Sequence, residues 1–215
     1  MKVIAFNGSY RKDWNTGTLL RKVLEGAASQ GAETKLIHLY DLNYKGCRSC
    51  FACKTKNGKS YGECIIKDDL EPIFKEIKES DVIILGTPIY FRSVSGEMKS
   101  FLERLLYPNF TYTNPPCSLL AKSIKVGFIY TMNNTEVEMK KNNINDHLEV
   151  IENTANFIFG PIERLYSFNT FQFFDYSKVV ADKFDPEMKS IQREKQFPLD
   201  CEKAFEMGKR FVNEL

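Results

Sequence analysis

Residues 1–18 have the sequence MKVIAFNGSYRKDWNTGT, in which a short apolar run gives way to a polar loop. Lys2 to Phe6 has the continuous apolar character of a short buried strand. Asn15 to Thr18 opens a pattern of helical spacing, whose apolar positions are Leu19, Leu20, Val23 and Leu24. This stretch therefore predicts a strand, a polar loop and a helix in succession.

The loop between this strand and this helix has the character of an anion site. A helix N-terminus has four unpaired backbone N–H groups and the positive end of the helix dipole, and both stabilise a phosphate. Arg11 adds a guanidinium group suited to phosphate. Short polar side chains are available at Ser9, Asn15, Thr16 and Thr18. From this stretch alone, a plain polar loop before a helix is an equally good interpretation.

Length and composition favour one domain over residues 1–215. With 215 residues and 43% hydrophobic content, the chain can bury one sizeable core. A net charge of +2, with basic and acidic residues interspersed, argues against a surface for nucleic acid or an anionic membrane. No apolar run reaches the roughly 20 residues of a membrane helix, and the N-terminal run is too short for a secretory signal. We expect a cytoplasmic protein with reduced thiols.

Segments of strand type and helix type alternate along the chain. Asp81 to Thr87, with the sequence DVIILGT, is almost continuously apolar, as in a parallel sheet covered on both faces. Such alternation predicts an α/β fold with right-handed crossovers and ligands at the carboxyl ends of the strands. The other predicted strands are Thr34 to Leu39, Ile124 to Thr131 and Ile162 to Phe168, and the other predicted helices begin at Asp68 or span Gly96 to Leu106 and Val137 to Phe159.

The loop after the Asp81 to Thr87 strand indicates which kind of ligand binds. Residues 87–99 have the sequence TPIYFRSVSGEMK. We expect Pro88 to stop the strand and Ser93 to Gly96 to present backbone amides before a helix. Tyr90 and Phe91 offer flat apolar surface, so the loop favours a flat, partly polar heterocycle. No GxGxxG follows the first strand and no GxxxxGK[ST] occurs, which excludes a Rossmann dinucleotide site and a P-loop.

Taken together, the two loops resemble a known family. GSYRKDWNTGTL fits the pattern GSxRxxxNTxxL, and TPIYFRSVSGEMKSFLER fits TPxYxxxxSGxxKxFxxR. Over most of residues 1–170 the chain resembles the NADPH-dependent FMN reductase and quinone reductase branch of the flavodoxin-like superfamily. The resemblance implies a flavodoxin-like three-layer sandwich with a five-stranded parallel sheet in the order 2-1-3-4-5. We expect one such domain, with a cysteine-rich insertion at about 40–67 and a C-terminal extension at about 170–215.

The resemblance also implies bound FMN. FMN would take hydride from NAD(P)H, a transient donor, and pass it to a quinone, a flavin or a similar small acceptor. No catalytic side chain is then required, and His38, one of only two histidines, is expected to be structural. The residues assigned to the FMN phosphate are Ser9, Arg11, Asn15, Thr16 and Thr18, those assigned to the isoalloxazine edge are Pro88, Ile89, Tyr90, Phe91 and Ser93, and those assigned to the far side of the ring are Thr131 and Asn133.

Four of the six cysteines lie close together in the sequence and leave part of the function open. Cys47, Cys50, Cys53 and Cys64 resemble the ligand run of the iron–sulfur flavoproteins, which hold a four-iron cluster through thiolates. Ten residues separate Cys53 from Cys64, a longer spacing than in those relatives. We favour no metal, with a cluster, a zinc ion or a redox-active Cys47–Cys50 pair as alternatives. The alternative functions are an iron–sulfur flavoprotein in electron transfer and a non-enzymatic flavin redox sensor.

The segment from about Thr170 onward extends beyond a minimal fold of this kind. We expect it to end in a helix after Pro198 that packs on the sheet. The resemblance implies a homodimer with flavin sites near the subunit boundary. An aromatic cluster would supply apolar surface to such a dimer, and its members are Phe171, Phe173, Phe174 and Tyr176.

Overall fold

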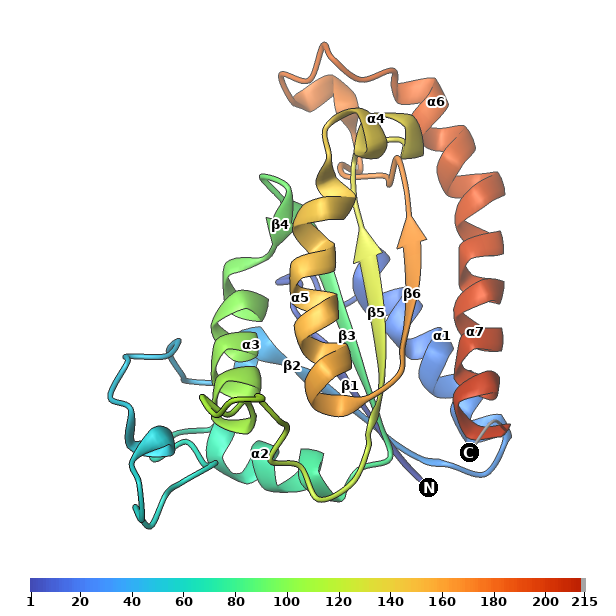
Figure 1. Cartoon of the computed structure of the whole chain (residues 1–215). Coiled ribbons are helices and arrows are strands. Elements are labelled where there is room, and N and C mark those ends of the chain that lie inside the picture. The colour runs from blue at the N-terminus through green and yellow to red at the C-terminus, as the bar shows by residue number, and fades with distance from the viewer. Residues whose placement is uncertain (214–215) are drawn as a thin grey trace.

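Five parallel strands form a central sheet between two layers of helices in the computed structural model, which describes residues 1–213 (Figure 1). The strands are β1 (Lys2–Asn7), β2 (Glu33–His38), β3 (Val82–Tyr90), β4 (Ser93–Val94), β5 (Lys125–Thr131) and β6 (Ile162–Ser167). The helices are α1 (Asn15–Ser29), α2 (Leu70–Glu79), α3 (Gly96–Asn109), α4 (Glu136–Lys141), α5 (Ile144–Phe159), α6 (Pro186–Ile191) and α7 (Phe197–Asn213).

The sheet has the strand order β2-β1-β3-β5-β6. Every neighbouring pair in this order is parallel, whereas β4 is a two-residue strand that pairs antiparallel with the end of β3. Counted over the five parallel strands, this is the predicted order 2-1-3-4-5, so the predicted fold class is confirmed. The carboxyl ends of β1, β3 and β5 consequently lie side by side at one edge of the sheet.

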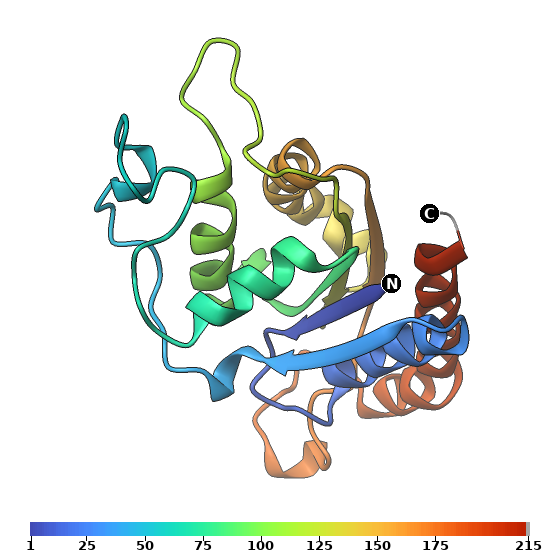
Figure 2. The same cartoon turned by 90° about the horizontal axis from the view of Figure 1, so that it is seen from below.

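Alternate residues of each central strand are buried on opposite faces of the sheet. In β1, Val3 and Ala5 pack in one apolar cluster with α1 and α7, whereas Ile4 and Phe6 pack in the other cluster. Figure 2 shows α1 and α7 together on one face and α2, α3 and α5 on the other. Because both faces are covered, the strands need continuous apolar sequence, as the pattern in β3 indicated.

The C-terminal extension completes the layer that α1 begins. Helix α7 follows a π-helical turn at Gln192–Gln196 and lies against α1. At Gly208 the two helices are so close that a Cβ would lie 2.0 Å from the carbonyl oxygen of Val23. The expected C-terminal helix is therefore present and packs mainly on α1. Among the helices of residues 1–213, none has both the length and the apolar character needed to cross a membrane.

Two predicted boundaries were wrong. Pro88 does not stop β3, which continues to Tyr90. Its pairing with β1 ends at Gly86, so Pro88 has a parallel partner only in β5 and its missing N–H is tolerated there. The predicted helix from Val137 to Phe159 is two helices, because Asn143 adopts a left-handed φ of 53° between α4 and α5.

Candidate functional site

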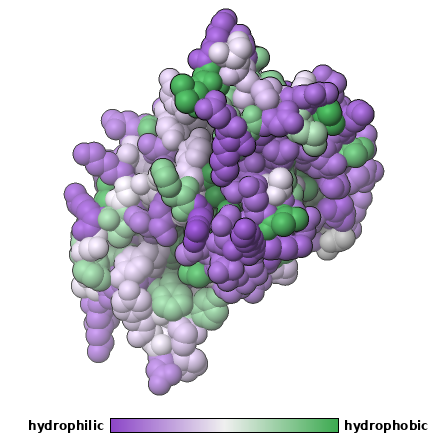
Figure 3. Space-filling view, turned by 90° about the horizontal axis from the view of Figure 1, so that it is seen from above, coloured by the Kyte–Doolittle hydropathy of each residue, from purple (hydrophilic) through white to green (hydrophobic). Residues whose placement is uncertain are grey.

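A cavity of about 280 Å³ lies at the carboxyl ends of β1, β3 and β5. Figure 3 looks onto this end of the molecule and shows a largely hydrophilic face with separate apolar spots. Loops from three strands and the segment after β6 contribute to its wall. The lining residues are Ser9, Tyr10, Arg11, Trp14, Asn15, Thr16, Pro88, Ile89, Tyr90, Thr131, Met132, Asn133, Thr170 and Gln172.

The cavity brings together all the predicted site residues except Thr18, Phe91 and Ser93. Thr18 lies one turn into α1, and its amide already donates to the Trp14 carbonyl at 2.8 Å. Phe91 is fully exposed at the tip of the β3–β4 hairpin, and Ser93 pairs with Tyr90 within that hairpin. The assignment of these three residues to a cofactor therefore stays a prediction without support from the cavity.

Helix α1 begins at the cavity, after the loop Gly8–Trp14, which we call the phosphate loop. Trp14 occupies the N-cap of α1 and provides no side-chain hydrogen bond to the first helical turn. Asn15 and Thr16 in that turn are buried and line the cavity. The hydroxyl of Thr16 is 2.8 Å from that of Thr131, which ties the helix to the end of β5. An uncapped helix N-terminus with hydroxyl and amide neighbours is suited to an anion.

The segment after β6 closes one side of the phosphate loop. The carbonyl of Phe171 accepts hydrogen bonds from the Trp14 indole N–H and from the side-chain Nδ2 of Asn15, both at 2.9 Å. The Arg11 guanidinium donates to the Gln172 carbonyl at 2.5 Å and lies over the Trp14 ring. Trp14 thus packs between the loop and this segment. Gln172 lies 161 residues after Arg11 in the chain, so no local sequence pattern could predict that it lines the cavity.

A buried cation supports the loop after β5. Lys189 of α6 is 2% exposed, and its Nζ donates to the backbone and side-chain oxygens of Asn133 and to the side-chain oxygen of Asn169. Burial lowers the pKa of Lys189 to about 8. Its contacts hold the Asn133 wall of the cavity against the segment after β6. Sequence reasoning missed this residue, because lysine is usually exposed and nothing in its surroundings marks it.

A family model for the NADPH-dependent FMN reductases matches residues 1–124 of this chain. The matched part contains both β1 and β3 with the loops that follow them, and it is more than half of the chain. The chain belongs to this FMN reductase family. The predicted family resemblance is thus confirmed.

Curated relatives of this FMN reductase family member carry two kinds of name, iron-sulfur flavoprotein and, for a protein of Bacillus subtilis, putative NAD(P)H-dependent FMN-containing oxidoreductase. An iron-sulfur flavoprotein of Methanocaldococcus jannaschii is 42% identical over 104 residues, which are 48% of this chain and 51% of the relative. The chain therefore spans about half the length of the curated relatives that it matches.

Two solved structures show the same fold over nearly the whole chain. An NAD(P)H:quinone oxidoreductase from Methanothermobacter marburgensis matches with a TM-score of 0.72 at 11% identity, covering 97% of this chain and 98% of that one. An FMN-dependent NADH-azoreductase from Bacillus anthracis, solved in complex with FMN, matches with a TM-score of 0.66 at 12% identity, covering 99% and 100%. At such low identities the likeness establishes the fold.

Ser95 joins the phosphate loop to the loop after β3, a role that the sequence reasoning missed. Its buried hydroxyl donates to the Gly8 carbonyl at 2.6 Å and accepts from the Met98 amide at 3.3 Å as the N-cap of α3. Its own amide donates to the Thr87 hydroxyl at 3.0 Å. A serine immediately before the first residue of a predicted helix is a capping signal, so the sequence did contain an indication.

We expect Ser95→Ala to lower the free energy of unfolding by about 1–2 kcal/mol, because it removes an N-cap and leaves a buried carbonyl without its donor. Urea unfolding followed by circular dichroism measures this change. Ser93→Ala is the matched control, since Ser93 lies two residues before Ser95 and pairs with Tyr90 in the hairpin through its backbone. Equal stabilities of the two variants would contradict the role of Ser95.

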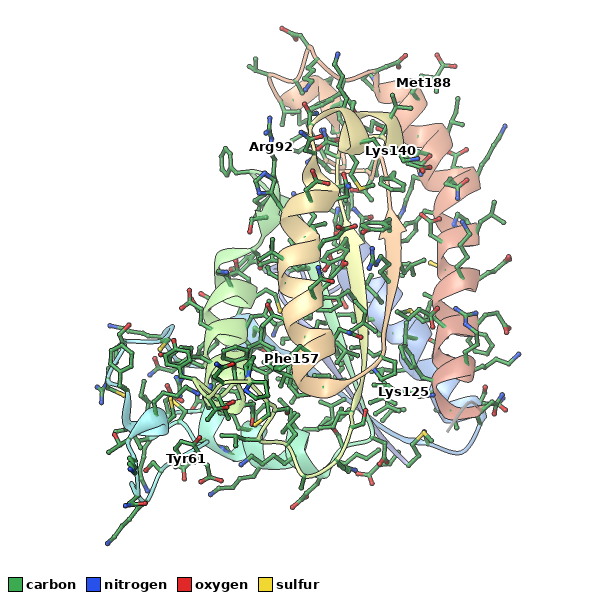
Figure 4. All side chains as sticks on the ribbon, in the orientation of Figure 1. Tyr61, Arg92, Lys125, Lys140, Phe157 and Met188 are labelled. Carbon is green, nitrogen blue, oxygen red and sulfur yellow. The ribbon has the colours of Figure 1, made fainter. Side chains whose placement is uncertain are left out.

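The four clustered cysteines lie at the other end of α3 from the phosphate loop. In Figure 4, Arg92 marks the β3–β4 hairpin and Tyr61 marks the cysteine segment, which we define as residues 47–64. The 14 residues of α3 separate the hairpin from the cysteine segment by about 20 Å along the helix axis. A cavity of about 20 Å³, room for about one water molecule, is lined by Cys47, Cys50, Cys53 and Cys64.

The thiols of the cysteine segment have different environments. All six cysteines of the chain are free. Cys50 is exposed, and the Ala52 backbone amide lowers the pKa of its thiol, whereas burial raises the pKa of Cys53. Within residues 1–213, the structure contains no group of three His, Cys, Asp or Glu side chains placed to hold a metal ion.

Proposed function

We propose that this chain is an FMN-dependent NAD(P)H oxidoreductase that passes hydride to a quinone, a flavin or a similar small acceptor. The observation that carries the proposal is the uncapped N-terminus of α1, which opens into a cavity that Pro88–Tyr90 also line. The family membership supports FMN as the cofactor.

The cavity fits the two chemically different ends of FMN. Ser9, Asn15 and Thr16 would hold the phosphate, because they surround the first turn of α1 with hydroxyl and amide groups. Ile89 and Tyr90 would lie along the isoalloxazine ring, for which they provide apolar and aromatic surface. Arg11, already held by the Gln172 carbonyl, would lie at the rim.

The residues of the chain need only bind and orient in this reaction. FMN, when bound, supplies the hydride chemistry itself. Tyr90 is 54% exposed, so the cavity is open on the side where a nicotinamide and then an acceptor must arrive in turn. Thr131 to Asn133 would lie along the far side of the ring, and Lys189 holds Asn133 in place by hydrogen bonds. No acid or base among them is required.

Anaerobic titration of the FMN-loaded protein with NADPH tests the proposal. We expect the flavin absorbance to bleach with about one NADPH per chain, and a quinone added afterwards to restore it, because one site serves donor and acceptor in turn. Stopped-flow absorbance measures both half-reactions, and heat-denatured protein with equal FMN is the control. Flavin that stays oxidised under excess NADPH and NADH would refute the oxidoreductase proposal.

We also propose that the protein works as a cytoplasmic homodimer. Two large aromatic side chains near the cavity support a partner surface, since Phe174 is 87% exposed and Phe91 is fully exposed. The other predicted members of the aromatic cluster pack within the chain, where Phe171 and Phe173 both contact Tyr176. Sedimentation velocity of the FMN-loaded protein measures the oligomeric state.

The second candidate function is an iron–sulfur flavoprotein, favoured by the four cysteines that share one cavity. The donor set suits a cluster, but the present space of about 20 Å³ does not, so the cysteine segment would have to open outward. Iron and acid-labile sulfide in anaerobically purified protein decide between the candidates. About four of each per chain would establish the cluster, and traces alone would exclude it.

A further inference from the structure

One buried amide links the end of β2 to the phosphate loop. Asn7, the last residue of β1, is 0% exposed, and β-sheet register places it opposite His38. The Asn7 Oδ1 accepts from the Ser9 backbone amide at 2.9 Å, and its Nδ2 lies 3.1 Å from the His38 Nδ1. The Ser9 hydroxyl in turn accepts from the Arg11 amide at 3.2 Å. The shape of the loop therefore depends on Asn7.

The chemistry of the Asn7 amide fixes the protonation of His38. Because Ser9 N–H donates to the amide oxygen, the NH2 group must face the imidazole, and only an unprotonated Nδ1 can accept from it. The ring proton then lies on Nε2. A second proton on Nδ1 would set donor against donor, so that Asn7 would have to turn over and release the Ser9 amide.

We propose that His38 is a positioning residue that must be neutral for the phosphate loop to hold its ligand, so that FMN affinity falls when His38 takes up a proton. This inference rests on the proposed FMN site. It assigns a role to a histidine that the sequence indicated only as structural, and the role acts entirely through Asn7 and Ser9.

The charged groups around His38 set the pH range of this effect. Burial and then Lys12 lower the pKa of His38 below its ordinary 6.5, with a smaller contribution from Arg21, whereas Asp41 and Asp13 act in the opposite direction. These four groups form two ion pairs, Lys12–Asp41 at 2.6 Å and Arg21–Asp13 at 3.0 Å.

The sign of the pH dependence follows from this lowered pKa. The His38 ring is neutral in the folded protein above about pH 6.5, so the hydrogen bond from Asn7 Nδ2 to His38 Nδ1 is fully present there. As the pH falls through the lowered pKa, the ring is protonated, and both the loop geometry and its contribution to stability are lost. The FMN phosphate also titrates near pH 6, so wild-type data alone would not isolate His38.

Comparison of the wild-type protein with His38→Asn at each pH cancels the titration of the FMN phosphate, because both proteins bind the same ligand. The asparagine Oδ1 can accept from Asn7 Nδ2 as the imidazole Nδ1 does, but it does not titrate. FMN dissociation constants from flavin fluorescence should agree within about threefold at about pH 8. The wild-type constant should exceed that of His38→Asn at about pH 5, by up to about tenfold.

His147→Asn is the matched control, because His147 is exposed on α5 and is the other histidine of the chain. It should follow the wild-type profile. His38→Leu, which has no acceptor, should bind FMN about tenfold more weakly than wild type at about pH 8.

The outcomes separate the two proposals. If the ratio of the wild-type to the His38→Asn dissociation constant is the same at both pH values, the role of His38 is overturned while the FMN site stays intact. Absence of FMN binding at every pH would overturn both proposals. Nitrogen NMR of the wild-type protein gives a second test that needs no variant: at about pH 8 the His38 proton should lie on Nε2, and a proton on Nδ1 would contradict the inference.

Discussion

Replacing Gly17 by alanine should weaken FMN binding by about 100-fold, or about 3 kcal/mol. A Cβ at Gly17 would lie 1.8 Å from the carbonyl oxygen of Lys12 and 2.9 Å from its carbonyl carbon. These are backbone atoms of the phosphate loop, so the loop must move away from the first turn of α1. Ser9 and Thr16 would then no longer face one phosphate together. The prediction follows from the proposed FMN site.

Gly96→Ala provides the matched control for this substitution. Gly96 lies in the first turn of α3, after the β3–β4 hairpin, and a Cβ there would meet nothing within 4 Å. We expect its FMN affinity to stay within about twofold of wild type, and its stability to rise slightly because alanine favours helix. Fluorescence titration measures affinity, and circular dichroism verifies the fold. Unchanged affinity in Gly17→Ala would mean that the phosphate is bound elsewhere.

The strand order and most of the cavity could be predicted because they depend on local sequence patterns. The apolar run of β3 and the alternation of strand and helix fix a parallel sheet, and a parallel sheet gathers the loops after its strands at one edge. Ser9 and Thr16 could therefore be placed together with Ile89 and Thr131 although up to 122 residues separate them.

The missed features depend on contacts between distant segments. Pro88 remains within β3 because the pairing of β1 with β3 ends at Gly86, so Pro88 has a partner only in β5. The sequence around Pro88 does not show where that pairing ends. Lys189 is buried because it meets Asn133 and Asn169, 56 and 20 residues away along the chain. Asn143 breaks a helix that its neighbours would otherwise continue, and asparagine permits this conformation without requiring it.

Helix α3 contacts both the cysteine segment and the phosphate loop. Glu103 of α3 accepts from the Cys47 amide at 3.2 Å, while Ser95 caps the start of the same helix against the phosphate loop. Lys54, within the cysteine segment, donates to the Tyr107 carbonyl at 2.6 Å near the helix C-terminus. Anything that opened the cysteine segment would therefore act first on α3.

Arg104→Met should lower the free energy of unfolding by about 3–5 kcal/mol, the usual cost of breaking a buried ion pair. The Arg104 side chain is 0% exposed and pairs with the Asp68 carboxylate. It also donates to the Lys45 carbonyl at 3.2 Å and to the Ile66 carbonyl at 3.3 Å. One guanidinium thus holds the chain on both sides of the cysteine segment. Its removal leaves the two carbonyls without this donor and the Asp68 carboxylate with the Leu70 amide as its remaining donor.

Urea unfolding measures the loss of stability, and limited proteolysis shows where it is concentrated. We expect new cleavage within residues 47–64 at urea concentrations that leave the wild-type protein intact, because the two ends of this segment separate before the sheet unfolds. Arg210→Met is the matched control: the Arg210 side chain is 46% exposed and pairs with Glu163 on the surface, so its loss should cost less than about 1 kcal/mol. Similar losses in the two variants would show that Arg104 contributes no more than a surface ion pair, and the cysteine segment would then owe its position to Lys54 and Glu103 instead.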